Sequence, residues 1–91
     1  ASKAAMIGLG KSLSQVLSPR TRTNIIAPGL IEQSSMFNEM RPERKKYHEL
    51  NNPLKKLLNK DALAEIIYEL TTEKWSHLNG AIIPVNGGAY V

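Results

Sequence analysis

The chain has 91 residues, which is enough for one small domain and excludes a two-part enzyme within this chain alone. It has no cysteine and only two histidines, far apart in sequence, so disulfides and thiolate metal sites are excluded and we expect no metal site. The net charge is +4. The sequence shows no signal-peptide pattern and no apolar run near the ~20 residues of a membrane span, so we expect a soluble, cytoplasmic protein without a membrane partner.

The first predicted element is a helix from Ser2 to Leu17. Apolar residues recur in it at steps of three and four: Met6, Leu9, Leu13, Val16 and Leu17. Ala4, Ala5 and Ile7 widen this stripe, so we expect a helix covered on more than one side. Gly8 and Gly10 each cost up to about 1 kcal/mol relative to alanine, which predicts close approach by another backbone.

A strand and a long excursion are predicted next. Ser18-Pro19 ends the helix, and the stretch from Thr23 to Ala27 has the content of a strand that breaks at Pro28-Gly29. From Leu30 to Leu58 the chain is polar and only weakly periodic. Long excursions after the carboxyl end of a strand are where α/β proteins place lids, which predicts a substrate lid at about 30–58.

The last third predicts a helix and a second strand. Asn59 is a suitable N-cap for a helix from Lys60 to about Glu73, and residues 81–85 form a short apolar run that stops at Gly87 and Gly88. The order helix, strand, lid, helix, strand predicts an α/β fold with parallel strands. Two parallel strands alone make a poor sheet, so we expect further strands from outside this sequence.

Four segments in this order carry a family resemblance. They are ASKAAMIGLGKSL, RTNIIAPGLI, NKDALAEIIYEL and HLNGAIIPVNGG. Together they resemble the C-terminal third of a short-chain dehydrogenase/reductase, close to the 3-oxoacyl-(acyl carrier protein) reductase type. The resemblance implies that residues 1–91 are the C-terminal portion of one Rossmann-like, doubly wound parallel sheet. It also implies that the N-terminal dinucleotide-binding half lies outside this sequence.

The resemblance implies a set of site residues. Lys3 matches the lysine that follows the family's catalytic tyrosine by four residues and hydrogen-bonds the nicotinamide ribose; that tyrosine falls outside this sequence. A cation one helical turn from a tyrosine lowers the pKa of its phenol. Pro28, Gly29 and Ile31 match the turn that meets the nicotinamide carboxamide. Gln33 stands where the family usually has threonine, and its amide can still donate and accept hydrogen bonds.

Two further positions depart from the family pattern. Asn79 replaces the threonine of the family's Thr-Gly turn, and Asn86 replaces the aspartate of its Asp-Gly-Gly ending. Both replacements keep size and hydrogen-bonding capacity, so we interpret them as structural variants.

The implied function is hydride transfer between nicotinamide, of NAD or NADP, and a carbonyl or alcohol substrate, either a small molecule or one bound to an acyl carrier. We expect the 91-residue chain alone to be inactive and the full protein to be a homodimer or homotetramer. One alternative is a basic nucleic-acid-binding module using Arg41, Arg44, Lys45 and Lys46, although no interleaved aromatics accompany these cations and we expect no nucleic-acid partner. The other alternative is a non-catalytic oligomerisation fragment.

Overall fold

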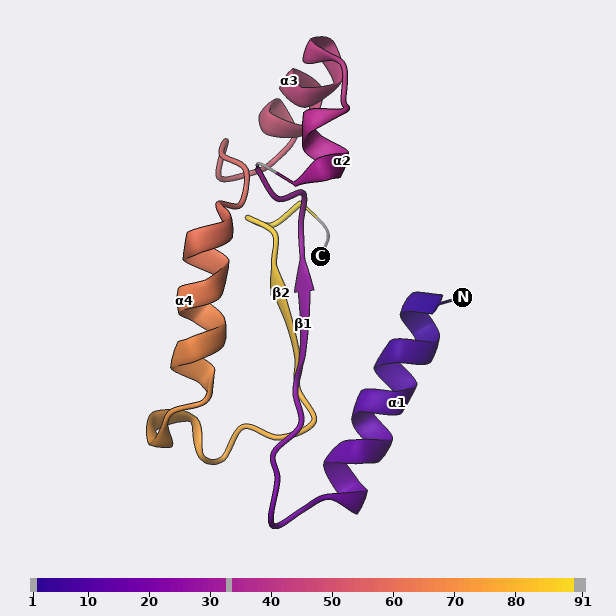
Figure 1. Cartoon of the computed structure of the whole chain (residues 1–91), viewed down its shortest axis with the longest axis vertical. Helices are drawn as coiled ribbons and strands as arrows, with labels where there is room; N and C mark the ends of the chain where they lie inside the picture. Colours follow the sequence, from indigo (N-terminus) through magenta and orange to yellow (C-terminus); the bar gives the residue numbers. More distant parts are fainter. Residues whose placement is uncertain (1, 33, 90–91) are drawn as a thin grey trace.

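A two-stranded parallel sheet stands at the centre of the computed structural model, which describes residues 2–32 and 34–89. Strands β1 (Ile25–Pro28) and β2 (Ile82–Val85) pair in parallel with Ile25 opposite Ile82, as the crossover predicted. Helix α1 (Ser2–Val16) lies on one face of the sheet and helix α4 (Lys60–Leu70) on the other (Figure 1). Among the described residues, no helix is long and apolar enough to cross a bilayer.

Helix α4 is fixed at both ends by side chains. The Asn59 side chain accepts from the backbone N–H groups of Asp61 and Ala62 at 2.8 and 3.3 Å, which confirms the predicted N-cap. The helix ends at Leu70 rather than near Glu73, because the hydroxyls of Thr71 and Thr72 bond back to carbonyls of the last turn. A short 3₁₀ turn, η1 (Glu73–Trp75), follows.

Helix α1 contacts the sheet through two small residues, Gly10 and Ser14, both buried. A Cβ on Gly10 would overlap the side chain of Ile25, so a side chain of β1 approaches this glycine rather than another backbone. Gly8 is exposed, and no described atom lies within 4 Å of the place its Cβ would take. The expected close approach at Gly8 is therefore wrong within the described chain.

The predicted lid contains two helices that the weak periodicity did not reveal, α2 (Ser35–Asn38) and α3 (Pro42–Leu50). The Ser34 hydroxyl caps α2 by accepting from Phe37 N–H at 3.1 Å, and Pro42 opens α3. The two ends of the lid are joined, since Leu58 N–H donates to Leu30 O at 3.3 Å and Glu32 N–H donates to Leu58 O at 2.7 Å. Residues 30–58, which we continue to call the lid after this prediction, thus form a closed loop on the carboxyl side of the sheet.

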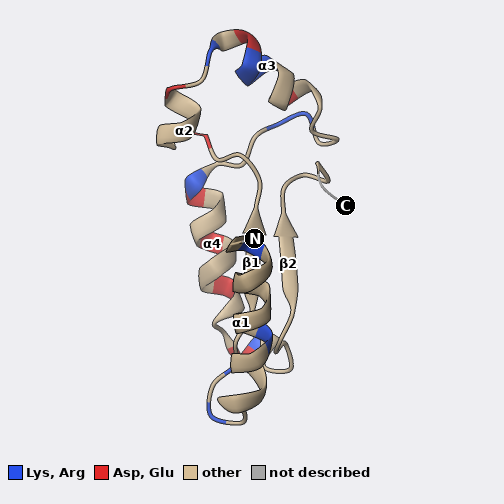
Figure 2. Cartoon of the chain, turned by 90° about the vertical axis from the view of Figure 1, so that its right-hand side faces the viewer, with Lys and Arg blue, Asp and Glu red and all other residues tan. Residues whose placement is uncertain are grey.

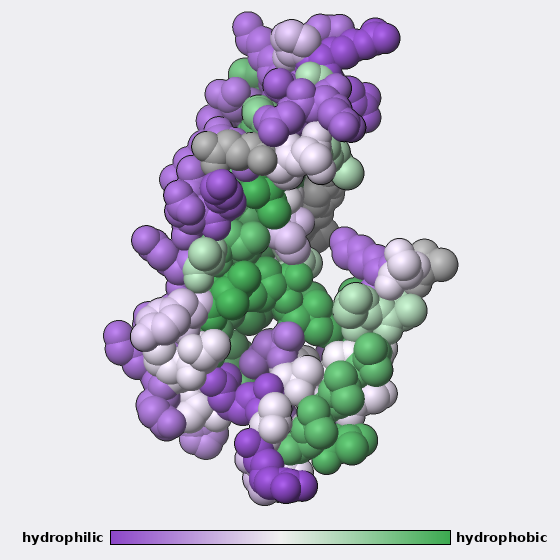
Figure 3. Space-filling model, viewed as in Figure 1, coloured by the Kyte–Doolittle hydropathy of each residue, from purple (hydrophilic) through white to green (hydrophobic). Residues whose placement is uncertain are grey.

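The described residues include no buried hydrophobic side chain, so they enclose no core. The radius of gyration is 15.2 Å, compared with about 12 Å for a compact domain of this length. Apolar residues lie exposed over the sheet and along α1 (Figure 3). This agrees with the expectation that two parallel strands and their helices cannot bury their apolar surface without further elements.

Candidate functional site

The turns that follow β1 and β2 pack directly against each other at the carboxyl edge of the sheet. Gly29 N–H donates to Val85 O at 3.0 Å, and a Cβ on Gly29 would lie only 3.0 Å from Cβ of Asn86. Gly87 and Gly88 have φ of +65° and +89°, and the Asn86 carboxamide oxygen accepts from Gly88 N–H at 2.9 Å. The glycines therefore let the ends of the two strands meet at close range.

Asn52 joins the lid to these turns, and sequence reasoning missed it. Its side-chain N–H donates to Asn86 O at 3.2 Å, and its side-chain oxygen accepts from Leu54 N–H at 2.9 Å. The residue is only 7% exposed, and Gly87 packs so closely on its amide that a Cβ there would overlap it. One buried asparagine thus connects the base of the lid to the end of β2.

A cavity of about 220 Å³ lies beside these turns, between the base of the lid and the start of α4. Its lining combines the apolar side chains of Leu30, Leu54, Ala62 and Val85 with the amides of Asn52 and Asn86. The carboxyl edge of a parallel sheet is where open α/β folds bind their ligands. This cavity is on the α4 side of the sheet, away from α1.

Lys3 lies on the other side of the sheet, on α1. It precedes Gly10 by seven residues and Ser14 by eleven, so all three share the helix face that contacts the sheet. The amino end of α1 is level with the carboxyl-terminal end of β1 (Figure 1). The exposed Lys3 is therefore at the same end of the sheet as the Pro28-Gly29 turn.

The structure brings some of the predicted site residues together and leaves others apart. Pro28, Gly29 and Ile31 form one continuous turn, in which Ile31 pairs with Leu58 at the base of the lid. Among the described residues, no hydrogen bond or ion pair connects Lys3 to this turn. Gln33 lies outside the described residues.

Asn79 has a structural role at the opposite, amino end of the strands. Its side-chain oxygen accepts from Thr23 N–H at 2.9 Å, and its side-chain N–H donates to Ser14 O at 2.9 Å. Asn79 therefore connects the last turn of α1 to the start of β1 through these two hydrogen bonds. Its position supports the interpretation of this residue as a structural variant.

Comparison with known proteins agrees with this arrangement. The family model described as enoyl-(acyl carrier protein) reductase matches residues 1–90. The chain is 35% identical over 92 residues to the 3-oxoacyl-(acyl-carrier-protein) reductase FabG of Buchnera aphidicola subsp. Acyrthosiphon pisum, covering 100% of this chain and 37% of that protein. It is 37% identical over 89 residues to dehydrogenase/reductase SDR family member 4 of Sus scrofa, covering 96% of this chain and 32% of that protein.

Solved structures share the fold. A short-chain dehydrogenase/reductase from Brucella melitensis, described as a glucose/ribitol dehydrogenase, superposes with a TM-score of 0.89 at 36% identity, over 98% of this chain and 36% of that one. A short-chain dehydrogenase from Bacillus anthracis gives a TM-score of 0.83 at 26% identity, over 98% of this chain and 35% of that one.

The parallel strands, the helices on both faces and the paired turns at the carboxyl edge define a Rossmann-like α/β fold. The chain spans little more than a third of the relatives it matches, 37% of the Buchnera reductase. It belongs to the short-chain dehydrogenase/reductase family, as the resemblance of its four segments predicted. Members of this family use NAD(P)H.

Proposed function

We propose that the chain is the C-terminal part of an NAD(P)(H)-dependent oxidoreductase that transfers a hydride between nicotinamide and a carbonyl or alcohol. The observation that carries this proposal is the family match over residues 1–90, which includes the packed turns at Gly29 and Asn86. We call the longer protein that would contain this chain the complete enzyme. Its substrate-binding and dinucleotide-binding surfaces extend beyond the 91 residues.

The residues present fit the nicotinamide end of such a cofactor. Lys3 is exposed, so its ammonium group is available to donate to a ribose hydroxyl, and the turn from Gly29 to Ile31 offers backbone groups to a carboxamide. When bound, the cofactor supplies the hydride. In this proposal Lys3 orients the ribose and lowers the pKa of a tyrosine phenol four residues earlier, while the amide of Gln33 provides a further polar contact.

The 91-residue chain alone is inactive in this proposal. Its support is the absence of buried apolar side chains among the described residues and the match to only about a third of each relative. The test is NAD(P)H oxidation with a ketone, measured on the purified chain and on the complete enzyme, with intact mass establishing which form is present. Turnover by the complete enzyme and none by the 10.1 kDa chain is expected. Turnover by the chain would contradict the proposal.

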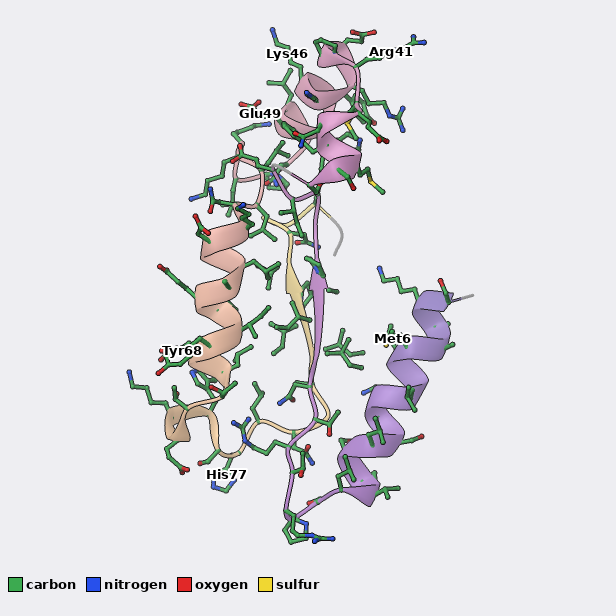
Figure 4. The ribbon with its side chains drawn as sticks, in the orientation of Figure 1. Met6, Arg41, Lys46, Glu49, Tyr68 and His77 are labelled. Atoms are coloured by element: carbon green, nitrogen blue, oxygen red, sulfur yellow. The ribbon has the colours of Figure 1, made fainter. Side chains whose placement is uncertain are left out.

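For the substrate, we propose a carbonyl group carried by an acidic carrier protein. The support is the charge of α3 and its N-cap residue Arg41. Arg41, Arg44 and Lys46 are exposed, and the Lys45 ammonium nitrogen lies 4.7 Å from the ring centre of Phe37. Charged residues of both signs gather around α2 and α3, whereas α1 carries few (Figure 2). The side chains of Arg41 and Lys46 extend outward from the top of the lid (Figure 4). Such a surface attracts an acidic partner.

Charge reversal tests this substrate class. In the complete enzyme, the double variant Arg41→Glu and Arg44→Glu is expected to raise KM for a carrier-bound 3-oxoacyl substrate and to leave KM for a small neutral ketone unchanged. Lys74→Glu is the matched control, because Lys74 is also exposed but lies in η1, outside the lid. Equal effects on the two substrates would argue against a carrier-bound substrate.

A further inference from the structure

We infer that Asn52 is a positioning residue for the cofactor site: it holds the turn after β2, and through it the turn from Pro28 to Ile31. This inference rests on the proposed function, in which the turn from Pro28 to Ile31 meets the nicotinamide carboxamide. Asn52 does not touch the cofactor in this account. It acts through Asn86, which lies between it and Gly29.

The contacts form a continuous chain from the lid to the site. Asn52 donates from its side chain to Asn86 O at 3.2 Å, and Asn86 in turn packs against Gly29, whose N–H is bonded to Val85 O. Gly87 closes on the amide of Asn52 from the other side. Because the glycines leave no spare volume in these contacts, a shift of the turn after β2 is transmitted to Gly29 rather than absorbed.

Burial makes this hydrogen bond consequential. Asn52 is 7% exposed, and both its amide oxygen and its amide nitrogen are used, for Leu54 N–H and Asn86 O respectively. The Asn86 carbonyl also accepts from Ala89 N–H at 3.2 Å, so loss of the Asn52 donor would leave it with one hydrogen bond fewer. In Asn52→Asp the carbonyl would also face a carboxylate oxygen, which cannot donate to it.

Asn51 is a matched control for Asn52. It is the adjacent residue and the same amino acid, and its side chain also donates to a backbone carbonyl, Tyr47 O at 2.8 Å. Asn51 is exposed, however, and its bond stays within the end of α3. The two asparagines therefore differ in burial and in whether their bond reaches the site.

The experiment compares Asn52→Asp, Asn52→Ala and Asn51→Asp in the complete enzyme. Asn52→Asp keeps the volume and the acceptor for Leu54 N–H but replaces the donor to Asn86 O with a carboxylate oxygen. Affinity is measured by titration for two probes: NADH or NADPH, whichever the parent binds, and ADP-ribose or its 2′-phosphate, which lacks nicotinamide. Hydrogen exchange of the Gly29 amide is measured in parallel.

We expect Asn52→Asp to bind the reduced dinucleotide about tenfold more weakly, equivalent to about 1.4 kcal/mol, because the hydrogen bond that holds the turn after β2 is lost and two oxygen acceptors face each other in its place. Its affinity for the probe without nicotinamide should match the parent's, and its Gly29 amide should exchange faster. Asn51→Asp should resemble the parent in all three measurements.

Two results would overturn the inference while leaving the proposed function intact. One is an Asn52→Asp enzyme with parental affinity for NAD(P)H. The other is an equal loss for both probes in Asn52→Asp and Asn52→Ala, which would make the role of Asn52 a general structural one. A parent enzyme that binds neither probe would instead overturn the proposed function, and the inference with it.

Discussion

The two helices that flank the sheet are attached to it in different ways. Helix α4 is held at both ends: Leu58, just before it, pairs through its backbone with Leu30 and Glu32 after β1. At the other end Arg22 donates to Leu70 O at 2.8 Å and to Leu78 O at 3.0 Å. Helix α1 is attached through its carboxyl half alone, by Gly10, Ser14 and the Asn79 amide. Its amino half, which carries Lys3, has no such attachment among the described residues.

This difference indicates that the two helices have different roles in the fold. A helix pinned at both ends completes the crossover between two parallel strands and needs little else. Helix α1 keeps Met6 and Leu9 61% and 56% exposed, and Figure 4 shows Met6 on the side of the helix toward the sheet. Its apolar surface and its lysine are therefore available to elements outside these residues, and variants in α1 should affect function more than variants in α4.

The largest expected effect is that of Lys3→Ala on turnover. In the complete enzyme we expect kcat to fall by about 10²–10⁴-fold, because general acid–base catalysis is worth that much and the tyrosine would lose its neighbouring cation. Lys3→Arg should also turn over poorly, since a planar guanidinium does not replace a compact ammonium. Steady-state kinetics measures both.

Lys11 is the control for Lys3 on the same helix. Its ammonium nitrogen lies 3.4 Å from Gly80 O, at the amino end of the strands. Lys11→Ala should therefore leave kcat near the parental value. Parental kinetics in Lys3→Ala would show that Lys3 is not the lysine of the family's catalytic pair.

The next effect concerns the two glycines of α1. Gly10→Val should lower the free energy of unfolding of the complete enzyme by about 1–3 kcal/mol, because its side chain would overlap Ile25. Gly8→Ala should raise it by up to about 1 kcal/mol, since alanine is the better helix former and the site is open. Urea unfolding measures both. Destabilisation by Gly8→Ala would instead place Gly8 against a surface outside the described residues.

A smaller effect is expected on the α4 side. Arg22→Met keeps an unbranched side chain about as long as the arginine stem but removes both donors to the carbonyls of Leu70 and Leu78, which should cost about 1 kcal/mol. Hydrogen exchange should become faster in the last turn of α4 and stay unchanged in α1. The exposed Arg20, two residues earlier, provides the control as Arg20→Met. An equal response in both helices would contradict the separate attachment of α4.

The order of elements could be predicted from the sequence because its signals are local. Asn59 and the apolar spacing after it specify α4, and the crossover length specifies parallel pairing. The pattern did not reveal α3 because its sequence, PERKKYHEL, is mostly polar and shows no apolar stripe. The start signals available are Pro42 at its first position and the acidic Glu43 in its first turn.

Only those parts of the candidate site that contain a sequence motif could be predicted from the sequence. Pro28-Gly29 and Gly87-Gly88 are turn signals that can be read along the chain, and the structure packs them together. Asn52 gives no such signal, because its burial depends on a hydrogen bond to Asn86, 34 residues away. The environment of Lys3 depends on elements beyond these residues, which no local pattern specifies.

Substitutions on the outer face of α1 should have the smallest effect on stability. They should, however, change the assembly of the chain. Leu9 and Val16 are two turns apart on that face and are 56% and 76% exposed. Replacing both with lysine should change the stability of the helix by no more than about 0.5 kcal/mol, because both side chains are largely exposed.

We nevertheless expect the double variant Leu9→Lys and Val16→Lys to change the particle size. Contiguous exposed apolar surface drives association, and two lysines would place like charges in any symmetric contact of this helix with its copy. Light scattering at micromolar concentration should show the parent chain as a dimer or larger and the variant as a smaller species. Met36→Lys is the control, because Met36 is 68% exposed but lies on α2 in the lid. A parent chain that runs as a monomer of 10.1 kDa would show that the outer face of α1 does not drive association.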